Sequence, residues 1–199
     1  LNTITVLLDK NRLQDAERLI SKYPGSSPDL VFQQGALAFL KKDYSLAQKL
    51  FREAARRASE TTAENALFNE NLAALNANDA SGAAALIKEA AGSSRLRESI
   101  LFEQAHYAAK RMAPQAAELL ANFITLAETP ALKTQARLDQ VEVALNLNPP
   151  DLETVQAILP LLEKEQLSPE QTMQLARLNI LEAESRQTGV SGRQRRLVL

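Results

Sequence analysis

One group of side chains in this sequence has the residue types and spacing for acid–base chemistry. His106 is the only histidine, with Glu103 three residues before it and Lys110 four residues after it. These spacings place the three on one face of a helix. A histidine beside a carboxylate and an amine can act as a general acid or base. We favour an ordinary half-buried or surface histidine, because no cysteine and no converging carboxylate pair accompanies it.

Motifs for covalent catalysis, metal binding and phosphate binding are missing from the sequence. There is no cysteine, which removes thiolate nucleophiles, cysteine metal ligands and disulfide bonds together. There is also no strand-to-helix nucleophile motif, no zinc-protease helix motif and no glycine-rich phosphate loop. Glu163, Glu165, Glu182 and Glu184 are most simply solvated charges on helices. We therefore expect no enzyme, no cofactor and no metal.

The composition is typical of a folded, soluble chain rather than a disordered one. Of 199 residues, 45% are hydrophobic and 24% are charged, which is enough apolar material for a substantial core. No apolar run approaches the roughly 18 residues of a membrane span, and no charged-then-apolar leader is present. The absence of cysteine fits the cytoplasm or the periplasm and slightly favours the periplasm. The compartment stays open.

Basic side chains form two clusters, but the chain as a whole is balanced in charge. Lysine plus arginine total 23, against 24 for aspartate plus glutamate. A nucleic-acid surface needs several cations on one face with exposed aromatics for stacking, and aromatics make up only 5% of the chain. We therefore expect solvated helix faces rather than a nucleic-acid site. The clusters are Lys49, Arg52, Arg56 and Arg57, and Arg193, Arg195 and Arg196.

These groups must be positioned by helices, and the segment 29–59 shows how. Two apolar stripes with three- and four-residue spacing predict two amphipathic helices. Between them lie two lysines followed by Asp43 and Tyr44, and Asp43 can cap the second helix. A turn this short requires antiparallel neighbours. The first stripe is Val31, Gly35, Ala38 and Phe39, and the second is Leu46, Ala47, Leu50, Phe51 and Ala54.

The order of small and aromatic residues in this segment resembles the tetratricopeptide repeat (TPR) family. The family pattern has a glycine and an aromatic in the first helix, a tyrosine in the turn, and alanine, aromatic and alanine in the second helix. The resemblance implies an all-α fold, a right-handed superhelical solenoid of antiparallel helix hairpins built for binding. The matching residues are Gly35, Phe39, Tyr44, Ala47, Phe51 and Ala54.

Other segments are imperfect copies of this hairpin. The small residue expected in successive second helices is Ala16, Ala47, Ala83 and Ala116. The intervals from 16 to 47, from 47 to 83 and from 83 to 116 bracket the family's repeat length of roughly 34 residues. The irregularity of these intervals places insertions in the connections, as a solenoid allows.

The later part of the chain is less regular. Pro160 should bend the helix that is expected after Asp151, or divide it in two. We expect a repeat domain of about five hairpins plus a trailing helix over residues 1–187, with a tail or the start of another element at 188–199. Both ends present apolar half-repeats with no partner helix, so we expect an excerpt of a longer solenoid that can self-associate through its ends.

In the TPR family, the first helix of each hairpin lines the concave side of the superhelix, where ligands bind. The resemblance therefore implies that inward positions of the first helices contact a partner. Phe32 and Phe68 can anchor an apolar peptide or helix, or they can pack between adjacent hairpins, and the sequence leaves both open. The implied positions are Asp29, Phe32, Ala36, Leu40, Asn65, Phe68, Leu72, Asn76, Glu98, Leu101, Ala105 and Ala109.

The function implied by this resemblance is that of a non-catalytic scaffold for protein–protein interaction, bacterial in style, within a larger assembly. It would bind a partner peptide, helix or domain on its concave face. The alternative is a structural spacer or self-assembly module of a longer solenoid, for example in an envelope or secretion complex. An RNA-binding solenoid ranks third.

Overall fold

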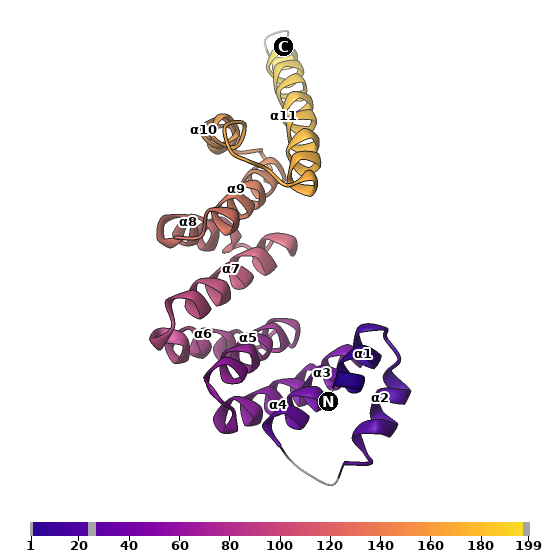
Figure 1. Cartoon of the computed structure of the whole chain (residues 1–199). Helices are drawn as coiled ribbons and strands as arrows, with labels where there is room; N and C mark the ends of the chain where they lie inside the picture. Colours follow the sequence, from indigo (N-terminus) through magenta and orange to yellow (C-terminus); the bar gives the residue numbers. More distant parts are fainter. Residues whose placement is uncertain (1, 24–26, 197–199) are drawn as a thin grey trace. The chain divides into compact units, whose positions relative to one another are not determined.

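The computed structural model describes residues 2–23 and 27–196, with side chains as far as Gln187, and this part of the chain consists of helices joined by turns and short connections. It contains eleven α-helices and one short 3₁₀ helix, and no strand (Figure 1). The prediction of an all-α fold is confirmed. Within the described ranges, no helix combines the length and the apolar character that crossing a bilayer requires.

The helices group into two compact units, residues 1–100 and 101–199, and the division falls within α7. The prediction of one repeat domain over 1–187 contains no such division. Residues 188–196, predicted as a tail or a following element, continue the last helix. The helices are α1 Asn2–Asp9, α2 Leu13–Ile20, α3 Pro28–Leu40, α4 Tyr44–Arg57, α5 Glu60–Asn76, α6 Ala80–Glu89, the 3₁₀ helix Ala90–Gly92, α7 Ser94–Lys110, α8 Ala116–Leu126, α9 Pro130–Leu145, α10 Leu152–Leu162 and α11 Pro169–Arg196.

The two helices predicted in segment 29–59 are α3 and α4. α3 begins with Pro28 in its first turn, and the side chain of Ser27 accepts a hydrogen bond from the N–H of Leu30. Asp43 caps α4 in the same way, through the N–H of Leu46 at 3.1 Å, as predicted. α4 packs against α3 and also against α5, so its apolar side joins one helix pair to the next.

Four connections between consecutive helices share one backbone geometry. In each, a residue other than glycine has a positive φ: Asn11 at 55°, Lys42 at 64°, Asn78 at 57° and Met112 at 50°. Its N–H donates to the carbonyl three residues earlier, and the following N–H donates to the carbonyl five residues earlier. This is the Schellman arrangement that ends many helices. The conformation therefore recurs once per helix pair from α1 to α8, and it is not found between α9 and α10.

A buried alanine follows each of these turns, at the start of the second helix. Ala16, Ala47 and Ala83 come five residues after the residue with positive φ, and Ala116 comes four residues after it. All four are almost completely buried, as expected for small residues at a close helix crossing.

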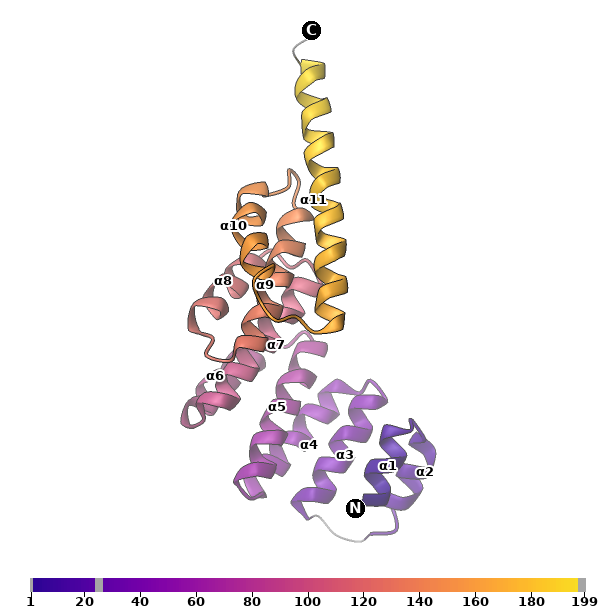
Figure 2. The same ribbon diagram turned by 45° about the horizontal axis from the view of Figure 1, so that its top comes forward.

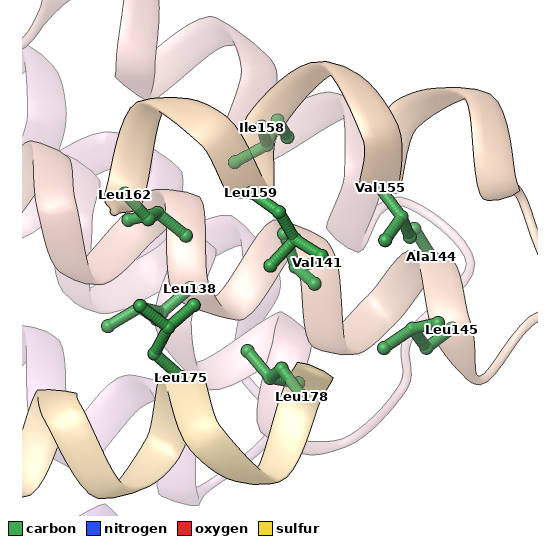
Figure 3. Packing of buried hydrophobic residues seen from close by; sticks show 10 residues of the cluster. All are labelled: Leu138, Val141, Ala144, Leu145, Val155, Ile158, Leu159, Leu162, Leu175 and Leu178. Carbon is green, nitrogen blue, oxygen red and sulfur yellow. The ribbon is translucent and has the colours of Figure 1, made fainter. Parts of the chain in front are cut away.

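Unit 2 has two core clusters, one formed by α7, α8 and α9 and one formed by α9, α10 and α11. Leu138 and Val141 of α9 lie between Leu162 of α10 and the pair Leu175 and Leu178 of α11 (Figure 3). α10 is one helix from Leu152 to Leu162, so Pro160 does not divide it in two. Pro160 lies in its last turn, where the missing N–H removes at most one hydrogen bond of the helix.

Candidate functional site

The candidate site of unit 1 is a groove of about 370 Å³ that lies mainly between the first helices of successive pairs. α1, α3 and α5 all contribute to its walls, because α3 contacts both α1 and α5. The apolar lining residues are Leu8, Phe32, Ala36, Phe39, Leu40 and Phe51, and the polar ones are Thr5, Asp9, Gln33 and Asn69.

The aromatic part of the groove is held in place by the α3–α4 crossing. The rings of Phe32 and Phe51 are tilted against one another, with their centroids 5.3 Å apart. Phe51 is buried and lies against Gly35, where a Cβ would be 2.9 Å from two atoms of the ring. Glycine at position 35 therefore leaves the space that the Phe51 ring occupies.

Polar side chains form part of the rim of the groove. Gln33 donates a hydrogen bond from Nε2 to Oγ1 of Thr5 at 3.1 Å, which ties α3 to α1. Asn69 donates from Nδ2 to the carbonyl of Asn65 within α5. The carboxylate of Asp9 lies at the end of α1, and no lysine or arginine lines the groove. The groove thus offers apolar contact with a few hydrogen-bonding groups at its edge.

Three of the four residues predicted in α3 lie together in this groove: Phe32, Ala36 and Leu40. Asp29 is in the first turn of α3 and does not line it. Phe32 also packs into the core, so at this residue both alternatives from the sequence apply.

The predicted residues of α5 are dispersed. Phe68 packs against the core formed by α6 and the first part of α7, which favours the packing alternative. Asn65 is exposed and Leu72 is half-buried. Asn76 uses Nδ2 to donate a hydrogen bond to the carbonyl of Leu72. The groove is lined from α5 by Asn69, which was not predicted.

The turn geometry aligns α7 with α5 at positions one residue later than those predicted. The prediction carries the separation of Ala83 and Ala116 over to the first helices. The residues with positive φ after α5 and α7 are Asn78 and Met112, and they are one position further apart than Ala83 and Ala116. The reason is that Ala116 follows Met112 by four residues, whereas Ala83 follows Asn78 by five. Positions in α7 that match those of α5 therefore lie one residue later than predicted.

Burial agrees with this offset only in part: the later positions His106 and Lys110 are more exposed than Ala105 and Ala109, but Phe102 is more buried than Leu101. Ala105 is 1% exposed and Ala109 is also buried, so neither side chain can contact a partner. Leu101 is half-buried against the core of unit 2, and Glu98 is half-buried as well. The residue of α7 that corresponds to Ala36 and Leu72 is His106.

A second polar cluster lies in unit 2 and is centred on Asp139 of α9. Asp139 is 1% exposed, and its Oδ2 lies 2.5 Å from Nδ1 of His106. Gln135 donates to Oδ1 at 3.2 Å, and Nζ of Lys110 lies 3.9 Å from the same atom. The hydrogen bond to Asp139 raises the pKa of His106, against the opposing effect of burial. The aspartate was not predicted, because it is distant from the histidine in the sequence and lies on another helix.

The cluster extends from α7 across α9 to α11. Glu142 accepts from Lys110 at 3.3 Å and from Nε2 of Gln174 at 3.5 Å. Gln174 in turn accepts a hydrogen bond from Gln135 at 3.0 Å. Glu103 faces the same region, and burial raises its pKa. The polar contacts of this cluster thus connect three helices of unit 2.

This geometry gives His106 a hydrogen-bonded carboxylate partner, Asp139, that the sequence did not indicate. A histidine oriented by an aspartate can act as a general base when a substrate proton lies beside its free nitrogen. Its ring is stacked on Phe102, with 5.4 Å between the ring centroids. Among the described side chains, no group of three or more His, Cys, Asp or Glu residues is placed to hold a metal ion.

The first basic cluster is partly neutralised by ion pairs. Arg52 lies 2.5 Å from Oε1 of Glu70 and 3.7 Å from Glu89, and Arg57 lies 2.8 Å from Glu53. Glu70 is completely buried, and this burial raises its pKa although Arg52 acts in the opposite direction. Arg52 thus connects α4 to α5 and α6. Arg193, Arg195 and Arg196 of the second cluster lie beyond the residues whose side chains are described.

Comparison with known proteins finds no relative of this chain: no protein-family model, no curated protein and no solved structure matches it. The resemblance to the TPR family therefore depends on the residues of segment 29–59 alone.

Proposed function

We propose that this protein is a non-catalytic, TPR-like binding scaffold whose unit 1 groove takes an apolar side chain of a partner protein. The groove is the observation that carries the proposal. Its volume of about 370 Å³ lies at the lower end of the range for ligand pockets, so it suits one or two side chains rather than a whole domain. An amphipathic helix or extended peptide with a large apolar anchor fits that description.

Two further observations support a repeat scaffold. The Schellman turns recur at Asn11, Lys42, Asn78 and Met112, at intervals comparable with the TPR repeat length of roughly 34 residues. The groove lies mainly between first helices, which is where the family resemblance implies that partners bind. In the proposed arrangement the helix pairs form a right-handed superhelix, and the groove is part of its concave side.

Peptide selection on the purified full chain tests this proposal. A displayed library of random peptides is selected on the wild-type chain, and the recovered peptides are measured by fluorescence anisotropy. We expect peptides with a Leu, Phe or Trp anchor. Leu40→Arg should weaken their binding by at least tenfold, because Leu40 is 41% exposed in the groove and a cation there removes apolar contact.

Leu46→Arg is the matched control. Leu46 is 45% exposed on α4 and does not line the groove. It matches Leu40 in residue type, in the substitution made and closely in exposure, and it differs in its place on the surface. Peptide binding should be unchanged in this variant. Equal binding to Leu40→Arg and to wild type would contradict the proposal, and so would equal losses in both variants.

A further inference from the structure

The outer face of α11 carries a row of apolar side chains that α9 and α10 do not cover. Leu175 and Leu178 point into the core of unit 2 (Figure 3). On the opposite side, Met173 is 73% and Ile180 is 61% exposed. Figure 2 shows α11 beside α9 and continuing past α10. The whole row consists of Met173, Ala176, Ile180 and Ala183, all of them exposed.

The spacing of this row is that of a coiled-coil seam. The intervals from Met173 to Ala183 are three, four and three residues, which places the four residues at alternating a and d positions of a heptad. Single exposed apolar residues are common on soluble proteins and need no explanation. A continuous seam along one helix matches the surface of another helix instead.

We propose that the second half of this seam, Ile180 and Ala183, pairs with the same residues of a second copy of the chain, in an antiparallel coiled coil. In this register Ile180 of each copy lies opposite Ala183 of the other, so a large residue meets a small one in both layers, and Ala176 lies opposite Gln187. Arg177 and Glu184 flank the seam on one side, at successive e positions, and both are exposed. In the same register, Arg177 of each copy lies opposite Glu184 of the other.

Charge selects this register and this orientation. Shifting the pairing by one heptad places Arg177 opposite Arg177 in one direction and Glu184 opposite Glu184 in the other. In a parallel pair, Arg177 and Glu184 would face the uncharged Thr172 and Asn179 of the other copy instead of each other.

A second copy is the occupant that these residues favour. Both members of each proposed ion pair belong to α11, so the helix is complementary to itself under a twofold rotation. That is the property of an isologous dimer interface. The dimer does not depend on the groove of unit 1, which shares no residue with the seam.

Charge reversal tests the dimer in the full chain. Arg177→Glu and Glu184→Arg are measured singly and together by analytical ultracentrifugation over a range of concentrations. Each single variant should weaken the dimer by at least tenfold, because it places like charges opposite each other twice. The double variant should recover most of the wild-type affinity, because it restores both pairs with their signs exchanged.

Two further substitutions separate loss of the seam from loss of the fold. Ile180→Lys should abolish dimerisation, whereas Leu161→Lys should leave it unchanged. Leu161 is a similarly large, exposed apolar residue on α10, outside the seam. Circular dichroism should show wild-type helix content for every variant. A wild-type chain that stays monomeric at hundreds of micromolar would overturn the proposal, as would a double variant no tighter than the singles.

Discussion

The backbone of Gly35 lies against the ring of Phe51, and a Cβ built on Gly35 would be 2.9 Å from two of the ring atoms. Observed Cβ atoms essentially never come this close to another heavy atom. Phe51 is buried and also contacts Phe32, so its ring has little freedom to move away. The contact thus fixes both the α3–α4 crossing and the aromatic part of the groove.

Gly35→Ala should therefore destabilise unit 1, although alanine is the better helix former. Overpacking of a core costs about 1–3 kcal/mol, against a gain of about 1 kcal/mol in helix propensity. We expect a lower urea midpoint, measured by circular dichroism, and faster hydrogen exchange in α3 and α4. Gly92→Ala is the control, because nothing lies within 4 Å of a Cβ there. A higher midpoint for Gly35→Ala than for the wild type would show that the ring can move away.

Ala47→Leu should be destabilising by about 1–3 kcal/mol, because the larger side chain must enter the crossing at the start of α4. Ala47 is completely buried. Ala84→Leu is the matched control, since Ala84 is exposed on α6 and leucine is well tolerated on a helix surface. An unchanged urea midpoint for Ala47→Leu would mean that α3 and α4 do not meet at this residue.

His106 should make the stability of unit 2 depend on pH. The ordinary pKa of histidine is about 6.5, and the hydrogen bond to Asp139 raises the pKa of His106 in the folded chain. The folded state therefore binds this proton more tightly than the unfolded state. The resulting stabilisation is fully present below about pH 6.5, and it is lost as the pH rises through the folded pKa.

His106→Gln should remove this dependence while keeping a hydrogen-bond donor near Asp139. The stability difference between wild type and variant should be largest near pH 6 and should shrink toward pH 8.5, measured by hydrogen exchange of peptides from residues 101–187. The carboxylates and the amine around His106 are present in both proteins, so the difference between the two proteins reports the histidine together with its coupling to these groups. A difference that stays constant with pH would contradict the histidine–aspartate pairing. The titratable groups around the His106–Asp139 pair are Glu103, Lys110 and Glu142.

Acidic peptides of the EEVD type should not bind the groove. Some TPR proteins clamp the terminal carboxylate of such a tail with lysine and asparagine on successive first helices. Here the groove presents Phe32, Ala36 and Leu40 from α3, and Asp9 adds a negative charge. Titration calorimetry should show no heat of binding, and micromolar affinity would contradict the chemistry that we assign to the groove.

The helices and caps were predictable because they depend on local sequence. Asp43 and Asp151 cap α4 and α10 as expected, through the N–H groups of Leu46 and Thr154. Apolar periodicity also located the α3–α4 pair, since its two stripes are complete.

Features that depend on distant residues were not predictable in the same way. The contact of His106 with Asp139 joins two helices and leaves no mark on the periodicity of either. A charged residue such as Glu70 predicts an exposed position in the middle of α5. Glu70 is instead completely buried, because Arg52 of α4 forms an ion pair with it. The register of α7 was missed because one connection differs by a single residue.

The Schellman turns suggest why one hairpin is recognisable by its residues while the others are not. The chain reversal depends on backbone dihedrals and on N–H to carbonyl bonds, which nearly any residue can supply. The residues with positive φ in the four turns are Asn11, Lys42, Asn78 and Met112, although glycine takes this conformation most easily. Different side chains at these turns therefore support the same reversal. A comparison based on dihedral angles along the chain can therefore align these four turns, where a comparison based on residue identity cannot.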